Sequence, residues 1–467
     1  MPEDARSKPP PAVTAEAAGF VASVRFETIP PSVIARGRVH MLDALGLALA
    51  GSRAGSTAIC RDHVAALGCT GPASVLGTAM RTAPRFAAFV NGTAMHADNF
   101  DDTSPQESPQ RNGGIHATAI VLPAALAIAE ANGLGGRALT EAFHAGMELA
   151  CKLNFAIDQR HYMSGYHVTS TLGVFGAAAA AARLCGLDAT GIAHALAGAA
   201  SRAAGLRANF GAMAEQTHTG AAAESGIVAA DLAQRGLTGA PDILEAEGGW
   251  FDAAGGFAPE VFCGRLGRPW VFDSPGMTIK PWPSGGMIHP AMTLLQDLVR
   301  SHGIDPRSVA RLVVRPNARI AAVLRHSRPA NAMQAKFSMP FCLAVLLIDG
   351  RVGIDSFVDE IVARPDIQAM MARVEIDPYE TVEAGYSNLT ALLEIHLADG
   401  TVLKGRADTA LGGLDAPMSY DDVTDKFVGC AAHAGWPEAR TKAAAAMVAE
   451  IESLPDVRAL TALLTAG

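Results

Sequence analysis

The segment from Asn91 to Thr103 concentrates groups that can do acid–base chemistry. It reads NGTAMHADNFDDT, and its second half holds one imidazole, three carboxylates, one amide and one hydroxyl. Only 18% of the chain is charged, so this cluster indicates either the wall of a site or a solvated turn. If the segment is helical, its polar groups divide between two faces of different chemistry, which favours a site wall. The expected faces are His96, Asn99, Phe100 and Thr103 on one side and Asp98, Asp101 and Asp102 on the other.

A second candidate segment is Gly165–Thr171, which leads directly into an alanine-rich apolar run. Thr169, Ser170 or Thr171 can cap the helix expected there, which leaves free N–H groups and the positive end of the helix dipole near His167. This arrangement suits a carboxylate or phosphate. An ordinary capped helix with a surface histidine accounts for the segment equally well.

The segment from Lys280 to Pro290 reads KPWPSGGMIHP. Its two glycines allow close approach of the backbone to a ligand, and Pro290 suits the first turn of a helix. His289 then stands at the start of that helix, with Lys280 and Ser284 upstream. A rigid interdomain linker also explains the prolines, but the lysine and histidine on either side of the glycines favour a site.

Two further histidines follow polar or glycine-containing loops. His116 opens an apolar segment, Ile115–Ala131, that is expected to be helical. His218 stands three residues after Glu215, so the two could form an acid–base couple, although a local salt bridge is the simpler explanation. With His96, His167 and His289, these residues form a recurring pattern of histidines at turns and helix starts.

Composition bounds the remaining function classes. The 467 residues carry a net charge of −9 without a basic run, which excludes an electrostatic footprint for nucleic acid. No stretch of about 20 residues is apolar enough for a membrane span. The seven scattered cysteines form no CxxC pair, which favours a reducing cytoplasm over a zinc or disulfide framework. Residues 1–14 lack the apolar core of a secretory signal and are expected to be a disordered tail.

Common catalytic motifs are missing. The chain has no GxSxG, Walker or HExxH pattern, so hydrolase, nucleotide and zincin interpretations have no support. The aspartates of the Asn91–Thr103 segment could bind Mg²⁺, but that chemistry needs a second acidic motif, for which Asp421-Asp422 is a poor candidate. We therefore expect no metal and no cofactor.

Hydrophobic periodicity predicts helices through most of residues 15–240, with Ile115–Ala131 and Thr171–Leu184 too long for strands. Strands are expected at Val309–Val314, Leu392–Leu397 and Thr401–Lys404, the last two joined by a turn at Ala398–Gly400. The chain becomes helical again after Thr409. These patterns predict a mainly α protein, with a large all-helical domain built from both chain ends (15–274 and 406–467) and a smaller α+β domain (275–405).

The ordered set of segments resembles the MmgE/PrpD family, which includes 2-methylcitrate dehydratase, cis-aconitate decarboxylase and iminodisuccinate epimerase. The resemblance covers most of the chain and implies a cytoplasmic, cofactor-independent homodimer with a large helical and a smaller α+β domain. It implies a pocket for a small carboxylate that Thr103, His116, His167 and His289 line, with Lys280 beside it. We expect Thr103, His116, His167 and Glu215 to be the catalytic residues. The matching segments are Asn91–Thr103, the start of the His116 helix, Gly165–Leu187, Asn209–Gly220, Lys280–Pro290 and Lys336–Phe341.

Two positions depart from the family pattern. Asn99 stands where the first aspartate of HxxDFDDT is expected, and Glu215 stands where TKPxH has lysine. The exchange of lysine for glutamate moves the local charge by two units and removes a counter-ion for a polycarboxylate. We therefore expect neither 2-methylcitrate nor cis-aconitate as the substrate. A substrate with fewer carboxylates, or with an amine that pairs with Glu215, fits better.

Three hypotheses follow. The first is a dehydratase-type lyase that abstracts a proton next to a carboxylate in a small hydroxy- or amino-acid, with His116 and His167 as acid and base and Glu215 as a further base or an anchor. The second is an epimerase or isomerase of an amino- or imino-dicarboxylate that uses the same proton abstraction. The third is a non-catalytic ligand-binding relative. The residues expected to hold the substrate are His96, Asp98, Asn99, His218, Lys280, Ser284 with the glycine N–H groups that follow it, and His289.

Overall fold

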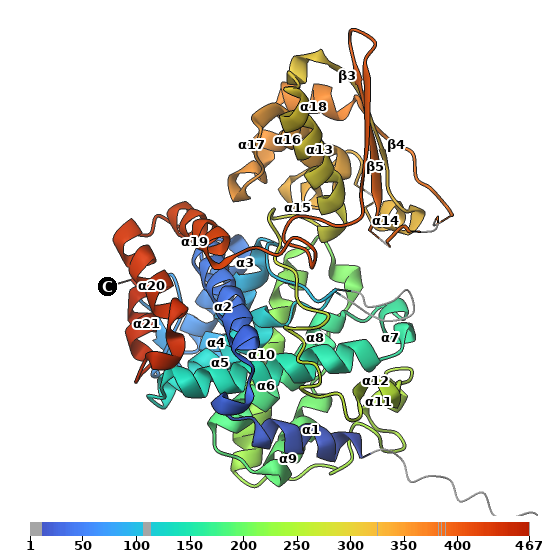
Figure 1. Ribbon diagram of the computed structural model, residues 1–467. Coiled ribbons are helices and arrows are strands. Elements are labelled where there is room, and N and C mark those ends of the chain that lie inside the picture. The colour runs from blue at the N-terminus through green and yellow to red at the C-terminus, as the bar shows by residue number, and fades with distance from the viewer. Residues whose placement is uncertain are drawn as a thin grey trace, which may run out of the picture.

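The computed structural model describes residues 12–105 and 114–466, apart from four single positions between them, Arg325, Val382, Ala384 and Asn388. Helices dominate, and the two-domain, mainly α architecture expected from the sequence is confirmed (Figure 1). Val13 and Thr14, which were expected in the terminal tail, are instead buried residues of the first helix. Residues 1–11 lie outside the described residues.

The larger domain is a helical assembly to which both ends of the chain contribute. Figure 1 shows the C-terminal helices, in red, packed beside the blue N-terminal ones. The larger domain also contains one short antiparallel hairpin, formed by β1 (Ala73–Ser74) and β2 (Arg81–Thr82). The helices are α1 (Val13–Ser23), α2 (Pro31–Gly51), α3 (Gly55–Ala66), α4 (Pro84–Ala97), α5 (Thr118–Ala131), α6 (Gly136–Ala156), α7 (Gln159–Met163), α8 (Val168–Leu184), α9 (Ala189–Ala200), α10 (Met213–Gln234), α11 (Trp250–Ala253), α12 (Pro259–Phe262), α19 (Tyr420–His433), α20 (Glu438–Ala449) and α21 (Arg458–Leu463).

The smaller domain packs helices against one face of a four-stranded sheet (Figure 1). The strand order is β4-β3-β5-β6, with β3 parallel to β4 and antiparallel to β5. The hairpin expected around Ala398–Gly400 is confirmed, because β5 and β6 pair antiparallel across it. The elements are α13 (His289–His302), β3 (Val309–Arg315), α14 (Ala318–Val323), α15 (Ala332–Ala335), α16 (Met339–Asp349), α17 (Asp359–Val362), α18 (Pro365–Met371), β4 (Val374–Ile376), β5 (Ala391–Leu397) and β6 (Val402–Ala407).

Each domain has its own hydrophobic core. One runs from Val13 to Ile279 and resumes from Val423 to Leu464. The other runs from Trp282 to Ile395. The chain therefore crosses between the cores immediately around Lys280, which places that lysine where the two domains meet.

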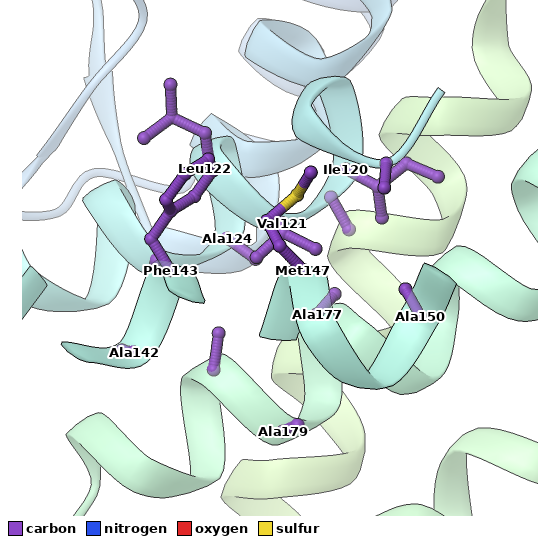
Figure 2. Close-up of a cluster of buried hydrophobic side chains, with 14 of the residues drawn as sticks. Ile120, Val121, Leu122, Ala124, Ala142, Phe143, Met147, Ala150, Ala177 and Ala179 are labelled. Atoms are coloured by element: carbon purple, nitrogen blue, oxygen red, sulfur yellow. The ribbon is translucent and has the colours of Figure 1, made fainter. Parts of the chain in front are cut away.

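The centre of the large domain is built from small side chains, which let helices approach closely. Figure 2 shows Ile120 and Val121 of α5 among alanines of α6 and α8. A Cβ added at Gly146 on α6 would lie 2.6 Å from the carbonyl oxygen of Gly176 on α8, and the reverse substitution would give 2.7 Å. Alanine and glycine thus fix the spacing of helices that carry the candidate site.

Helices α4 and α10 cross at a second glycine contact. A Cβ at Gly92 would lie 2.9 Å from the Cα of Gly220. The hydroxyl of Thr219 donates to the carbonyl of Gly92 over 2.8 Å, and the amide of Gln216 donates to the carbonyl of Ala97 over 2.7 Å. This contact brings the end of α4 beside the start of α10.

Replacing Gly220 with alanine is expected to destabilise the protein by about 1–3 kcal/mol, because overpacking forces helices apart. The new methyl group would collide with the Phe89 carbonyl and the Thr93 hydroxyl of α4. Chemical denaturation measures the loss. Gly429→Ala is the matched control: Gly429 is also inside a helix, its Cβ would meet nothing within 4 Å, and alanine there is expected to stabilise by about 0.5–1 kcal/mol. Equal effects in the two variants would contradict the packing argument.

Among the described residues, no helix combines the length and the apolar character that crossing a lipid bilayer requires.

Candidate active site

His96 is the centre of a buried ionic cluster. It lies in the last turn of α4, and its Nδ1 is 2.7 Å from Asp101 Oδ2. Its Nε2 is 2.8 Å from Glu215 Oε1 in the first turn of α10. Because both ring nitrogens face carboxylates, the imidazole satisfies both only when it is protonated.

The charge states of this cluster are mutually dependent. Burial opposes the charged form of His96, but Asp101 and Glu215 outweigh it and raise the pKa of His96 to about 10. Burial also raises the pKa of Glu215, yet the imidazolium of His96 lowers that pKa to about 2. The pKa of Asp101 lies well below its usual value, because His116, His96 and Lys280 outweigh its burial. The expected roles of Glu215 as a base or as an anchor for an amine do not fit this geometry, since its carboxylate is already neutralised.

The segment after His96 is not helical, so the two helical faces expected for it were wrong. Helix α4 ends at Ala97, and Asn99 adopts a left-handed conformation with φ of 53°. Asparagine tolerates this region better than most residues. The resulting turn directs the carboxylate of Asp101 back to His96, which a continued helix would not do.

Asn99 holds the lysine between the domains. Lys280 Nζ donates to Asn99 Oδ1 over 2.6 Å and to the Asn99 carbonyl over 3.0 Å. Asp101 Oδ1 lies 3.8 Å from the same ammonium group. Burial lowers the pKa of Lys280, and Asp101 and Glu215 offset part of that effect. Asn99 Nδ2 is buried and donates to none of the described residues.

His116 has one ring nitrogen committed and the other available. Its Nδ1 lies 2.6 Å from the carbonyl oxygen of Asp102 and 3.2 Å from Asp101 Oδ2. The carbonyl can only accept, so Nδ1 carries the proton and the neutral ring has its lone pair on Nε2. His116 precedes α5, which starts at Thr118 and not at Ile115 as expected. Its ring centroid is 5.1 Å from that of His96.

His167 forms a histidine pair that the sequence analysis did not predict. Its Nδ1 lies 2.9 Å from Nδ1 of His218. One Nδ1 must donate and the other must accept. At least one of the two imidazoles therefore carries no proton on Nδ1 and is neutral. Burial lowers the pKa of both histidines, with Glu215 partly offsetting it. The expected local pair of Glu215 with His218 is therefore wrong, because Glu215 contacts His96 instead.

The cap expected at α8 differs as well. His167 itself is the N-cap residue, and no side chain caps the helix. Ser170 donates to the carbonyl of His218 over 3.1 Å, and Thr171 donates to the carbonyl of His167 over 3.2 Å. These hydroxyls position the histidine pair and leave the helix start uncapped.

Thr103 and Asp98 lie on either side of the turn that Asn99 forms after α4. Thr103 forms an isolated antiparallel bridge with Thr278, two residues before Lys280. Lys336 Nζ donates to the carbonyl of Asp98 over 2.8 Å and lies 3.2 Å from Asp98 Oδ1. The 98–103 segment is therefore held by lysines from both sides.

Ser284 and His289 form a neighbouring pair. Ser284 Oγ lies 3.1 Å from His289 Nε2. Burial, with Lys280 and Lys426 nearby, lowers the pKa of His289 to about 3. Of the N–H groups expected to hold a carboxylate, that of Ser284 donates to the Trp282 carbonyl and that of Gly285 donates to the Lys336 carbonyl. For the Gly286 N–H group the expectation stays a prediction. His289 touches none of the other candidate histidines in the described part of the chain; its ring contacts Trp282.

Four buried partners of the site were not predicted as site residues. His40 Nδ1 lies 2.6 Å from Asp102 Oδ2. Lys426 Nζ lies 2.7 Å from Asp43 and donates to the carbonyls of Phe100 and Lys280. The signal was present, since His40 and Asp43 interrupt the otherwise apolar, buried part of α2 from Val39 to Gly51, where buried polar groups need partners. The missed residues are His40, Asp43, Lys336 and Lys426.

His96, Asp101 and His116 also bring three potential metal-ligand atoms within 4.8 Å of one another. However, Asp101 Oδ2 is only 2.7 Å from His96 Nδ1, and His116 Nδ1 is 2.6 Å from a carbonyl. Two ligands bound about 2.0–2.2 Å from one ion are usually separated by more than that. The spacing fits protons between the groups.

The Glu215→Gln variant is expected to lose about 3 kcal/mol of stability, because it leaves half of a buried ion pair. The loss should be largest between about pH 4.5 and 6.5. The glutamate, whose pKa is lowered to about 2, contributes fully above its ordinary value of 4.5 and gives up that contribution as the pH falls from 4.5 toward 2. The histidine, whose pKa is raised to about 10, gives up its contribution as the pH rises above its ordinary value.

Denaturant midpoints at pH 3.5, 5.5 and 8.5 check this expectation. Glu224→Gln, on the same helix, removes only an exposed pair with Arg85 and should change stability by less than about 1 kcal/mol at each pH. A loss in Glu215→Gln that does not vary with pH would contradict the ion pair.

Comparisons with known proteins agree with this architecture. The MmgE/PrpD N-terminal domain model matches residues 15–259, and the MmgE/PrpD C-terminal domain model matches residues 282–451. Cis-aconitate decarboxylase from Homo sapiens is 28% identical over 97% of this chain and 94% of its own length. The Mus musculus protein of that name is also 28% identical, over 97% of this chain and 93% of its own length. A cis-aconitate decarboxylase from Aspergillus terreus is 24% identical over 97% of this chain and 96% of its own length. Because the two family models together span most of both domains, this chain belongs to the MmgE/PrpD family.

Proposed function

We propose that this chain is a cofactor-independent lyase that transfers a proton next to a carboxylate of a small acid. The observation that carries the proposal is the hydrogen bond from His116 Nδ1 to the Asp102 carbonyl. It fixes the tautomer that presents an unprotonated Nε2, which is the form a general base needs. The relatives named cis-aconitate decarboxylase are also lyases, which supports the class.

In the proposed reaction, His116 Nε2 accepts the proton from the carbon next to the carboxylate. The electron pair of that C–H bond forms a double bond as the hydroxyl or amino group on the neighbouring carbon departs. One ring of the His167–His218 pair, in its protonated form, supplies the proton that the leaving group takes and returns to neutral imidazole; burial, which lowers the pKa of both rings, favours that release. Lys280 stabilises the negative charge that develops on the carboxylate.

The charges argue for a substrate with few carboxylates. Three acidic side chains face three cationic ones across the cluster. The acids are Asp98, Asp101 and Glu215, and the cations are His96, Lys280 and Lys336. A tricarboxylate would bring three more negative charges into a cluster that is already neutral, and unpaired buried charge is costly. A mono- or dicarboxylate that displaces part of the Asn99–Lys280 contact is the better fit.

A second candidate is an epimerase. It is favoured by the presence of two imidazole systems on different segments, His116 before α5 and His167 at the start of α8. Two bases on opposite faces of one carbon exchange its proton and invert the centre without breaking another bond.

A screen of small hydroxy-, amino- and unsaturated carboxylates, with cis-aconitate included, tests both candidates. Thermal shift first identifies acids that bind the native state. Proton NMR in D₂O then follows each binder. Appearance of an alkene or of released carbon dioxide supports the lyase. If deuterium enters recovered or inverted substrate and no alkene forms, the lyase proposal is wrong and the epimerase takes its place. Binding without either change, in every case, contradicts catalysis and leaves a ligand-binding protein.

A further inference from the structure

A polar cavity of about 270 Å³ lies in the helical domain, outside the candidate active site. It is formed by the end of α6, by α12 and by the segment that follows α12. Figure 1 shows α12 beside α11 on one flank of the helical domain, below the smaller domain. None of the residues that line it belongs to the cluster around His96. The charged residues that line it are Lys152, Glu260, Arg265 and Arg268.

Lys152 provides a buried positive charge at this cavity. Its side chain is only 7% exposed, and Glu148 Oε1 lies 3.8 Å from its Nζ. Both oxygens of Glu148 already accept hydrogen bonds, from the N–H of Gly267 over 2.9 Å and from the N–H of Val271 over 2.6 Å. Burial raises the pKa of Glu148 to about 7, although Lys152 and these N–H groups oppose the shift. The ammonium group therefore has a distant and only partly ionised counter-ion.

Two arginines stand at the rim. Arg265 and Arg268 are exposed, and neither forms an ion pair with any described carboxylate. Glu260 is the one acidic residue among those that line the cavity. Three cations thus face one acid. A guanidinium group binds phosphate or carboxylate oxygens through two parallel N–H donors.

We propose that this cavity is a second, anion-binding site that takes a small oxyanion with two or more negative charges. Lys152 would form its floor, with Arg265 and Arg268 at its mouth. A buried ammonium group without a close counter-ion is costly. An anion bound in the cavity would supply that counter-ion to Lys152. It would also connect α6 to the 263–275 segment, which Glu148 already ties to the same helix.

Isothermal titration at constant ionic strength tests the proposal with three probes: inorganic phosphate, pyrophosphate and malonate. We expect saturable binding of at least one of them. The Arg265→Ala/Arg268→Ala double variant loses the charged hydrogen-bond donors at the mouth of the cavity, so it should bind about 100-fold more weakly. Both arginines are exposed, so the variant should fold normally, which circular dichroism verifies.

Arg235→Ala is the matched control, because Arg235 is an exposed arginine of the same domain whose partner is Asp231. Its affinity for the probe should equal that of the unmodified protein. Only binding that the double variant loses is assigned to this cavity, since malonate can also enter the proposed active site. Within that binding, preference for the phosphates assigns a phosphoryl ligand and preference for malonate assigns a dicarboxylate, and either supports the site. Undiminished binding in the double variant, or no binding of any probe at about 10 mM, overturns it.

Discussion

The His116→Asn variant is expected to lose about 10²–10⁴-fold in kcat, the range that a positioned general base contributes. The asparagine amide can still donate to the Asp102 carbonyl that now holds His116 Nδ1. It has no nitrogen at the position of Nε2, so the substitution removes the base and keeps the hydrogen bond. Because His116 is only partly buried, with 14% of its side chain exposed, its loss should cost little stability.

The test requires an acid that the screen has identified as a substrate. Rates and denaturant midpoints are compared with those of His63→Asn, a matched variant in which an exposed histidine on α3 is replaced. His63→Asn should keep both values. If His116→Asn keeps kcat within about threefold while His167→Asn abolishes turnover, His116 is not the base and the assignment moves to the His167–His218 pair.

Residue type and spacing predicted which side chains lie near one another better than which of them pair. The residues selected as site residues were His96, His116, His167, His218, Asn99, Glu215 and Lys280. Contacts through Asp101 join His96, His116 and Lys280, with Glu215 on His96 and Asn99 on Lys280. The His167–His218 pair lies beside them, with the ring centroid of His167 6.3 Å from that of His96. These residues were selected by their type and by their position at turns and helix starts, because binding and catalytic side chains often lie on such segments. The family resemblance added the order in which the segments occur.

The pairings could not be predicted, because they depend on helix packing. Glu215 is three residues from His218 in sequence, yet it binds His96, which is 119 residues away. The close α4–α10 contact at Gly92 and Gly220 decides this partner, and no local pattern encodes it. The turn at Asn99 was missed for another reason: helical periodicity was extended past the point where a left-handed residue ends the helix.

The Lys426→Met variant is expected to lose about 3–5 kcal/mol of stability, since it leaves a buried carboxylate without its partner. Lys426 is only 6% exposed and lies 2.7 Å from Asp43, which is 2% exposed. Its Nζ also donates to the carbonyls of Phe100 and Lys280, over 2.8 and 2.9 Å. One ammonium group from α19 therefore holds α2, the turn after Asn99 and the lysine between the domains.

The pH dependence identifies the cause of the loss. Burial raises the pKa of Asp43 to about 6 even with Lys426 beside it. Without the lysine, that pKa rises further, so the variant takes up a proton and gains stability relative to the unmodified protein as the pH falls from 7.5 to 5.5. Denaturant midpoints at the two pH values measure the change. A loss that is equal at both would contradict the role of Asp43.

The double variant Asp43→Leu/Lys426→Met separates stability from positioning. Replacing both members of a buried pair with apolar groups of similar size is often neutral, so most of the lost stability should return. The carbonyls of Phe100 and Lys280 still lack their donor, so the turn that carries Asp101 and the backbone of Lys280 remain unsupported. We therefore expect kcat to stay about tenfold or more below that of the unmodified protein, because small misplacements of catalytic groups are costly. Recovery of kcat together with stability would show that Lys426 acts only through the fold, and that the site does not depend on its contacts with the two carbonyls.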